Sequence, residues 1–289
     1  MTSDGTILWR ALLQQATEAL QDAHEARWLC EEVFGERGPS FQLALSTAVT
    51  ERVVSRFDAL LARRIAGEPL QYVLGSWSFR TLELMVDQRV LIPRPETEVV
   101  TGVALDRARS FAAPVRVIDL GTGSGAIALS LAAEMPVGSI EVWATDVSAD
   151  ALDVARANLA GVGRKGSVVR FACGSWFDAL PNDMAGCVHV VVANPPYISP
   201  DDSELETSVR QWEPAIALFA DNDGLAAYQH IVGEAWHWLI DNGWLVLEIG
   251  YKQASAVGDL CRAAGLRDVL VTKDLAGRDR VIQARRPNR

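Results

Sequence analysis

Residues 117–129 decide the fold, and they read Val117-Ile118-Asp119-Leu120-Gly121-Thr122-Gly123-Ser124-Gly125-Ala126-Ile127-Ala128-Leu129. The apolar first part is typical of a buried strand, the glycines permit a tight turn, and the apolar residues after them begin a helix. Glycines at such a turn let a ligand approach the backbone at the helix N-terminus. This order of strand, turn and helix therefore predicts a nucleotide site in an α/β domain.

The chain from Val115 onward alternates apolar strands with helical segments. This alternation favours a mainly parallel sheet flanked by helices. Strands are expected at 115–120, 139–145, 167–172, 187–193, 243–249, 266–272 and 279–285, and helices at 124–134, 148–160, 223–241 and 253–264.

The tetrapeptide Asn194-Pro195-Pro196-Tyr197 directly follows one of these strands. Two successive prolines donate no hydrogen bond and fix φ, so the strand ladder ends with outward-pointing carbonyls. An amide and an aromatic ring stand beside those carbonyls. Such a site suits a planar nitrogen-bearing group that needs acceptors for its N–H bonds and a surface for its face. Asn-Pro alone is also a common turn signal, so the functional interpretation depends on all four residues together.

Asp146 ends the strand before the helix expected at 148–160, where a carboxylate can accept both hydroxyls of a ribose. Ligands of open α/β sheets bind at the carboxyl ends of strands, so Asp146 and the glycine turn should converge. The spacing Gly121-x-Gly123-x-x-Ala126 also fits a looser dinucleotide pattern, which leaves an NAD-linked dehydrogenase as an alternative. Asp119 favours S-adenosylmethionine, because a carboxylate there can order the loop and help receive a cationic amino group, whereas it would repel a pyrophosphate.

The N-terminal part of the chain has a different pattern of apolar residues. Residues 6 to about 68 show helical periodicity, and Gly67-Glu68-Pro69 ends it. Residues 72–79 and 82–86 are expected to form a hairpin-like pair of strands. We therefore divide the chain into a helical docking domain at 1–69, a β-hairpin linker at 70–92 and a catalytic domain at 93–289.

The composition limits the classes of partner. The chain has 289 residues, of which 49% are hydrophobic, and its formal net charge of −10 is unfavourable for gripping a long nucleic-acid backbone. The four cysteines lie far apart, and His230 and His237 have no carboxylate partners at ligand spacing, so we expect no metal. No apolar run approaches the length of a membrane span, and residues 1–6 have no basic segment. A cytoplasmic protein with no membrane partner is expected.

Taken together, Asp119–Gly125, Asp146 and Asn194–Tyr197 resemble the motifs of class I S-adenosylmethionine-dependent methyltransferases. Within this class the chain closely resembles the HemK/PrmC family of protein-(glutamine-N(5)) methyltransferases. Three further segments match the family: Leu91-Ile92-Pro93-Arg94-Pro95-Glu96-Thr97-Glu98, Glu213-Pro214-Ala215-Ile216-Ala217-Leu218 and Leu247-Glu248-Ile249-Gly250. The helical N-terminal domain followed by a hairpin is also the family layout, so the resemblance covers essentially the whole chain.

The resemblance implies a Rossmann-like, seven-stranded class I methyltransferase domain preceded by a small helical bundle and a β-hairpin linker. It also implies S-adenosylmethionine as the cofactor. Trp176 and Phe177 would border its adenine, although Ser175 stands where relatives often carry an acid that accepts from the adenine amino group. The remaining implied cofactor residues are Asp119, Gly121, Thr122, Gly123, Ser124, Gly125, Asp146 and Asn194.

The implied substrate is the glutamine in the Gly-Gly-Gln motif of peptide-chain release factors. Asn194, Pro195, Pro196 and Tyr197 would be the catalytic and substrate-binding residues. Arg94 and Glu96 are weaker substrate-side candidates, since a helix that starts with proline and carries acids in its first turn needs no further function. The alternative is an exocyclic-amine methyltransferase acting on DNA or RNA bases, which uses similar tetrapeptides. We expect a monomer that binds no nucleic acid directly.

Overall fold

The structure is a computed structural model that describes residues 7–288. The chain divides into two compact units, with the boundary in the sequence between Ser76 and Trp77. The expectation about residues 1–6 lies outside the described part. Among residues 7–288, no helix combines the length and the apolar character needed to cross a membrane.

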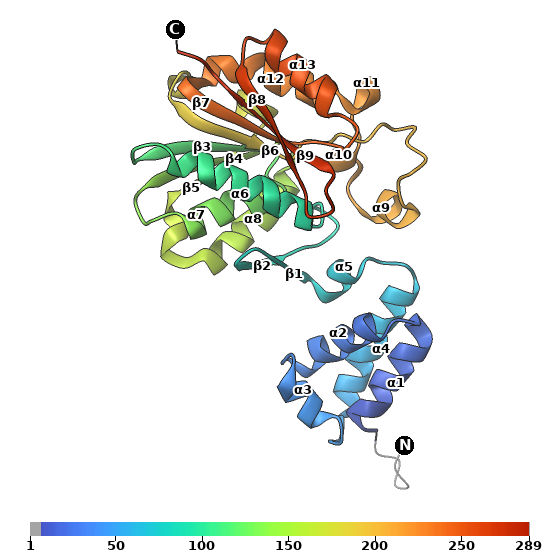
Figure 1. Ribbon diagram of the computed structural model, residues 1–289. Helices are drawn as coiled ribbons and strands as arrows, with labels where there is room; N and C mark the ends of the chain where they lie inside the picture. Colours follow the sequence, from blue (N-terminus) through green and yellow to red (C-terminus); the bar gives the residue numbers. More distant parts are fainter. Residues whose placement is uncertain (1–6, 289) are drawn as a thin grey trace. The chain divides into compact units, whose positions relative to one another are not determined.

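The first unit is helical, as its periodicity predicts (Figure 1). Its apolar faces share one core, in which Trp9 meets Phe34 and Phe41 edge-on at centroid distances of 5.3 and 5.6 Å. Such pairs add to the free energy gained from burial alone. Its helices are α1 (Trp9–Leu20), α2 (Ala23–Phe34), α3 (Pro39–Ala44), α4 (Glu51–Ile65) and α5 (Leu70–Leu74).

Helix α5 corrects one sequence prediction, because the strand expected at 72–79 is helical over its first part. Pro69 precedes the helix, and Gly75 ends it with φ +77° and an N–H bond to the Gln71 carbonyl of 2.9 Å. A preceding proline and a left-handed glycine at the C-terminus are helix-boundary signals, and they outweigh the short apolar run between them. The rest of the prediction is confirmed by the paired strands β1 (Ser76–Phe79) and β2 (Leu82–Met85).

The second unit contains a seven-stranded sheet in the order β5-β4-β3-β6-β7-β9-β8, which confirms the predicted fold class. The strands from β5 to β7 pair in parallel, and β9 is antiparallel to both of its neighbours. The bounds are β3 (Val115–Leu120), β4 (Ile140–Asp146), β5 (Val169–Cys173), β6 (Val188–Ala193), β7 (Leu239–Glu248), β8 (Arg267–Lys273) and β9 (Asp279–Arg285).

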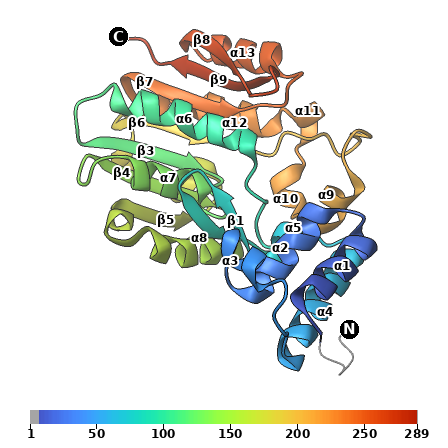
Figure 2. The same ribbon diagram turned by 60° about the horizontal axis from the view of Figure 1, so that its bottom comes forward.

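Helices cover both faces of this sheet (Figures 1 and 2). Along β3, Val115 and Val117 belong to a core shared with α6, α7 and α8, whereas Ile118 and Leu120 belong to a core shared with α12 and α13. This alternation follows from the two-residue period of a strand. The helix bounds are α6 (Pro95–Arg109), α7 (Ala126–Glu134), α8 (Ala149–Val162), α12 (Ala226–Trp238) and α13 (Ala254–Ala263).

The boundary between α12 and β7 differs from the prediction. The sequence favoured a helix as far as residue 241, but α12 ends at Trp238 and β7 begins at Leu239. Asn242 has a left-handed backbone with φ +64°, and the register of β7 against β6 shifts here. Such an irregularity admits extra residues into a strand, a feature that apolar periodicity does not reveal.

The carboxyl ends of four adjacent strands come together at one edge of the sheet. The registers pair Leu120 with both Thr145 and Ala193, and Ala193 with Leu247. The residues that follow β3, β4, β6 and β7 therefore lie side by side, at the edge where open α/β sheets bind their ligands. Between β6 and α12 the chain forms the short helices α9 (Thr207–Trp212), α10 (Ala215–Leu218) and α11 (Asp221–Gly224).

Candidate functional site

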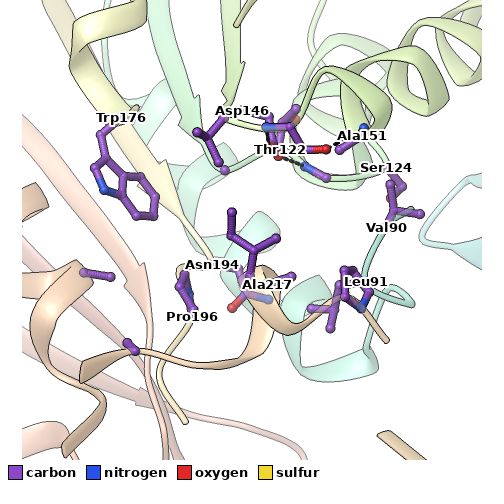
Figure 3. Close-up of a pocket in the computed structure, with 18 of the residues that line it drawn as sticks. Val90, Leu91, Thr122, Ser124, Asp146, Ala151, Trp176, Asn194, Pro196 and Ala217 are labelled. Carbon is purple, nitrogen blue, oxygen red and sulfur yellow. Dashed lines mark hydrogen bonds between the residues drawn. The ribbon is translucent and has the colours of Figure 1, made fainter. Parts of the chain in front are cut away.

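A cavity of about 480 Å³ opens at these strand ends. The glycine turn, Asp146, Trp176, Asn194 and Pro196 all line it, and Figure 3 shows their side chains around the same space. Four segments distant in sequence therefore share one cavity. The further lining comes from parts of two other segments, 89–97 and 214–230.

The glycine turn depends on left-handed backbone conformations. Gly121, Gly123 and Gly125 have φ values of +72°, +55° and +85°. A Cβ on Gly125 would lie 3.0 Å from Leu129 Cδ1, and one on Gly121 would lie 3.4 Å from the Trp176 ring. Side chains at these positions would strain the backbone, and one at Gly125 would also crowd Leu129. Gly121, Thr122, Gly123 and Ser124 line the cavity, whereas Gly125 caps α7 behind it.

Asp119 lies fully buried beneath the turn. Its Oδ2 accepts hydrogen bonds from the Thr122 hydroxyl at 2.6 Å and from the Ala128 N–H at 3.1 Å. Burial raises the pKa of Asp119 to about 7, although both hydrogen bonds favour its ionised form. Its Oδ1 has no hydrogen-bond partner within residues 7–288, and the residue does not itself line the cavity. Asp119 thus orders the loop from below.

Asp146 ends β4 and faces the cavity. Its Oδ2 accepts from the Gly123 N–H and its Oδ1 from the Ser148 N–H, both at 2.9 Å. Burial raises the pKa of this carboxyl, while the backbone N–H bonds act in the opposite direction. Each carboxylate oxygen has a further lone pair, so Asp146 can accept two more hydrogen bonds from a ligand.

Trp176 and Phe177 lie in different environments, although they are neighbours in sequence. Trp176 lines the cavity and has a left-handed φ of +45°. Phe177 is 1% exposed and stacks on Trp238 at 5.4 Å with an interplanar angle of 10°. The expectation that Phe177 borders the ligand therefore needs correction. Both residues belong to a short 3₁₀ turn, in which successive side chains point in directions about 120° apart, so only one of them reaches the cavity.

The tetrapeptide after β6 divides in the same way. Asn194 and Pro196 line the cavity, whereas Pro195 is buried and Tyr197 lies outside the lining. The Tyr197 hydroxyl donates to Glu248 at 3.3 Å, and burial raises the pKa of Tyr197. Asn194 Nδ2 donates to the Thr97 hydroxyl oxygen at 3.2 Å. In this geometry the Tyr197 ring supports the motif from the core side rather than facing the cavity.

Arg94 and Glu96 do not belong to the cavity lining among the described residues. Arg94 forms an ion pair with the buried Glu213, whose other oxygen accepts the Ile92 N–H at 3.1 Å. Glu96 lies in the first turn of α6, which begins at Pro95 as a proline-started helix should. Arg94 therefore connects two wall segments of the cavity instead of facing a ligand directly.

Two residues of the site, Thr97 and Glu248, carry little signal of their own in the sequence. Thr97 lines the cavity, and the fully buried Glu248 accepts its hydroxyl at 2.7 Å. Thr97 is a weak candidate from its place in the first turn of the helix that starts with proline, and Glu248 is indicated only by lying in a segment that resembles a known family. A general pattern could not find them, because a threonine in a helix and an acid at a strand end become partners only after folding.

The described part of the chain contains no cluster of three or more His, Cys, Asp or Glu side chains that could hold a metal ion. His230 lines the cavity, and its Nε2 lies 3.1 Å from Glu234 Oε1, one helical turn further along α12. This pair corrects the expectation that His230 has no nearby carboxylate. A histidine and a single acid, however, fall short of the usual set of metal ligands.

Comparison with known proteins now identifies the family. Residues 11–75 match the family model of the PrmC N-terminal domain, and residues 105–222 match that of the methyltransferase small domain. A release factor glutamine methyltransferase from Burkholderia pseudomallei strain K96243 is 42% identical over 269 residues, which cover 92% of this chain and 93% of the relative. The chain belongs to the release factor glutamine methyltransferase family. The resemblance inferred from the sequence motifs is thus confirmed.

Other relatives agree with this assignment. The release factor glutamine methyltransferase of Bordetella pertussis strain Tohama I is 44% identical over 258 residues, covering 89% of this chain and 92% of the relative. A methyltransferase structure from Pyrococcus furiosus superimposes with a TM-score of 0.52, covering 83% of this chain and all of the other. At 16% identity, that structure shows only the common methyltransferase fold. Membership of the family makes the chain a methyltransferase and removes the dehydrogenase alternative.

Proposed function

We propose that this member of the family transfers a methyl group from S-adenosylmethionine to the side-chain amide nitrogen of the glutamine in the Gly-Gly-Gln motif of release factors. The observation that carries the proposal is the shared cavity, in which the glycine turn and Asp146 lie with Asn194 and Pro196. A nucleotide site and an acceptor site for an amide thus open on the same space. The names of the relatives at 42% and 44% identity support the same substrate.

The residues at the turn fit S-adenosylmethionine. The glycines allow close approach to the backbone, the Asp146 oxygens retain lone pairs for ribose hydroxyls, and Trp176 offers an apolar face for adenine. The buried Asp119 carboxyl lies beneath a loop that would receive a cationic amino group, and that cation would favour the ionised form of Asp119 against the effect of burial on its pKa. Ser175 also lines the cavity and can accept from the adenine amino group through its hydroxyl or carbonyl. When bound, the sulfonium supplies an electrophilic methyl group.

The acceptor side must overcome the weak nucleophilicity of an amide. The lone pair of an amide nitrogen is delocalised into its carbonyl, as in the peptide bond. The Asn194 side-chain oxygen and, although the Pro195 residue is largely buried, the Pro195 carbonyl would accept the two N–H bonds of the glutamine. These bonds orient the nitrogen and strengthen as positive charge develops on it. The nitrogen then loses one proton to solvent or to a backbone acceptor, because Asn194 cannot serve as a base.

The two units would have different roles in the reaction. We assign the helical unit, which matches the PrmC N-terminal domain over residues 11–75, to docking of the release factor. The second unit would perform the transfer. A net charge of −10 suits a protein partner better than a nucleic-acid backbone, which makes the alternative of base methylation less favourable.

The test is to incubate the full-length protein with methyl-labelled S-adenosylmethionine and purified release factor. Proteolysis and mass spectrometry then locate the label. We expect a single methyl group on the glutamine of the Gly-Gly-Gln peptide. Label that appears in tRNA, rRNA or DNA, and not in the factor, would overturn the proposal.

A further inference from the structure

Glu248 is a buried carboxylate that the proposed methyl transfer does not use directly. It ends β7, and because Ala193 pairs with Leu247, Glu248 and Asn194 occupy adjacent strand ends. Glu248 is 1% exposed. Its Oε2 accepts the Thr97 hydroxyl at 2.7 Å, and its Oε1 accepts the Tyr197 hydroxyl at 3.3 Å. One carboxylate therefore connects, directly or through Thr97, to the first and last residues of the tetrapeptide.

The hydrogen bonds of Thr97 have a fixed polarity. An ionised carboxylate only accepts, so the single hydroxyl proton of Thr97 points toward Glu248. The Thr97 oxygen then presents only lone pairs to Asn194, 3.2 Å away. The Asn194 atom facing Thr97 must therefore be the NH₂ group, because an amide oxygen there would meet another acceptor. This assignment follows from the hydrogen-bond network and places the amide oxygen of Asn194 on the other side of its side chain.

The other end of the motif is held by a second set of contacts. Gln253 Nε2 donates to the Tyr197 carbonyl at 3.1 Å, while Gln253 Oε1 accepts the Gly250 N–H at 3.0 Å. The hydroxyl and the carbonyl of Tyr197 are thus both bonded to residues at or just after the end of β7. The backbone between Asn194 and Tyr197 is in addition stiffened by its two prolines. The orientation of the Asn194 side-chain amide still has to be restrained by its own contacts.

We propose that Glu248, acting through Thr97, is a positioning residue that holds the Asn194 amide with its oxygen toward the cavity, so that the site accepts an N–H donor. This inference rests on the proposed function, since it concerns how the same site receives a primary amide. This orientation would select the substrate side chain by its hydrogen-bonding polarity. Glutamine offers N–H donors to the exposed oxygen, whereas an ionised glutamate at the same place offers only acceptors and leaves that oxygen unpaired.

The charge state of Glu248 supports the geometry. Burial raises the pKa of Glu248 to about 7, and Thr97, Arg280 and Tyr197 favour the ionised form. The groups that face it come from every neighbouring element: Glu96 and Thr97 from α6, Tyr197 after β6, Tyr228 from α12 and Arg280 from β9. A protonated Glu248 could donate to Thr97, and the order of donors and acceptors would then no longer be fixed. Turnover should therefore rise as pH increases through about 7.

Three substitutions in the full-length protein test the proposal with release factor as substrate. Glu248→Gln leaves an amide that both donates and accepts, and Thr97→Val keeps the shape of Thr97 without its hydroxyl. Each should lower kcat roughly 10- to 100-fold, by analogy with residues that orient metal ligands, while S-adenosylmethionine affinity stays within about threefold. Thr97→Ser retains the hydroxyl and should restore kcat to within about threefold of the wild type. Glu248→Gln should also abolish the rise of kcat near pH 7.

Two outcomes of the kinetics would overturn the proposal. One is wild-type kcat in both Glu248→Gln and Thr97→Val. The other is a Thr97→Ser variant as impaired as Thr97→Val. Because serine keeps the hydroxyl, equal loss in the two variants would show that the hydroxyl is not what Thr97 contributes.

A second readout does not depend on the substrate. In protein labelled with ¹⁵N-asparagine, nuclear Overhauser effects should connect the Asn194 NH₂ protons to Thr97 in the wild type and weaken in Glu248→Gln. Absence of this contact in the wild type would overturn the orientation. If the contact is present but no label enters the release factor, the orientation is supported and the proposed function fails.

Discussion

The Arg94 guanidinium is paired with the buried Glu213 carboxylate, and this ion pair joins two of the segments that line the cavity. Glu213 is 5% exposed, and it also accepts the Ile92 N–H at 3.1 Å. Arg94 follows the lining residues Leu91 and Pro93 in the chain, and Glu213 precedes the lining residue Pro214. Arg94 therefore shapes the cavity without lining it.

Replacing Arg94 with alanine should loosen this wall. Removal of the guanidinium leaves the Glu213 carboxylate buried with one N–H donor, which should lower the free energy of unfolding by about 1–3 kcal/mol. The lower half of this range is expected, because the Arg94 side chain is 32% exposed. Urea denaturation measures the loss, and steady-state kinetics should show a raised KM for the release factor. Arg262→Ala, which breaks an exposed pair with Asp259 on α13, is the matched control.

Replacing Gly121 with alanine should weaken cofactor binding. Gly121 has φ +72°, and a Cβ there would lie 3.4 Å from the Trp176 ring. Gly138 has φ +78° with nothing within 4 Å of the same added atom, so Gly138→Ala carries the backbone penalty of about 1–2 kcal/mol without the contact. We expect both variants to lose similar stability, and only Gly121→Ala to lose affinity for S-adenosylmethionine by calorimetry. Equal affinities in the two variants would argue against Trp176 as the adenine surface.

The pH dependence of stability should reveal the buried Asp119. Burial raises the pKa of its carboxyl to about 7, compared with about 4 in the unfolded chain. Between these values the folded state binds more protons, so the free energy of unfolding falls as pH rises from about 4 to about 7. Asp119→Asn should flatten this slope in urea titrations, and Asp153→Asn on the exposed side of α8 controls for the lost charge. A slope unchanged in Asp119→Asn would show that the carboxyl is not buried as described.

The sheet and the nucleotide turn could be predicted from sequence because their signals are local. Apolar runs and glycines identified β3 and its turn. The rule that parallel strands present their carboxyl ends at one edge of the sheet placed Asp146 and Asn194 together. All three depend on residues close in sequence or on a general rule for parallel sheets. The strand from 279 to 285 was predicted with its observed bounds for the same reason.

The parts that failed depend on geometry that no local pattern encodes. The 3₁₀ turn sends Trp176 into the cavity and Phe177 onto Trp238, although both are large aromatic residues. The pairing of Arg94 with Glu213 and of Thr97 with Glu248 spans more than a hundred residues in each case. These contacts appear only when α6 and the strand ends have assembled.

We propose that Asn194 receives the substrate amide in the same cavity that would receive S-adenosylmethionine. The most direct test compares wild type and Asn194→Ala in single-turnover transfer of labelled methyl groups to the release-factor glutamine, with S-adenosylmethionine affinity measured in parallel. Loss of an acceptor that strengthens in the transition state should slow the transfer by about 100-fold or more. We expect that loss together with cofactor affinity largely retained. A wild-type transfer rate in Asn194→Ala would contradict the proposed role of Asn194.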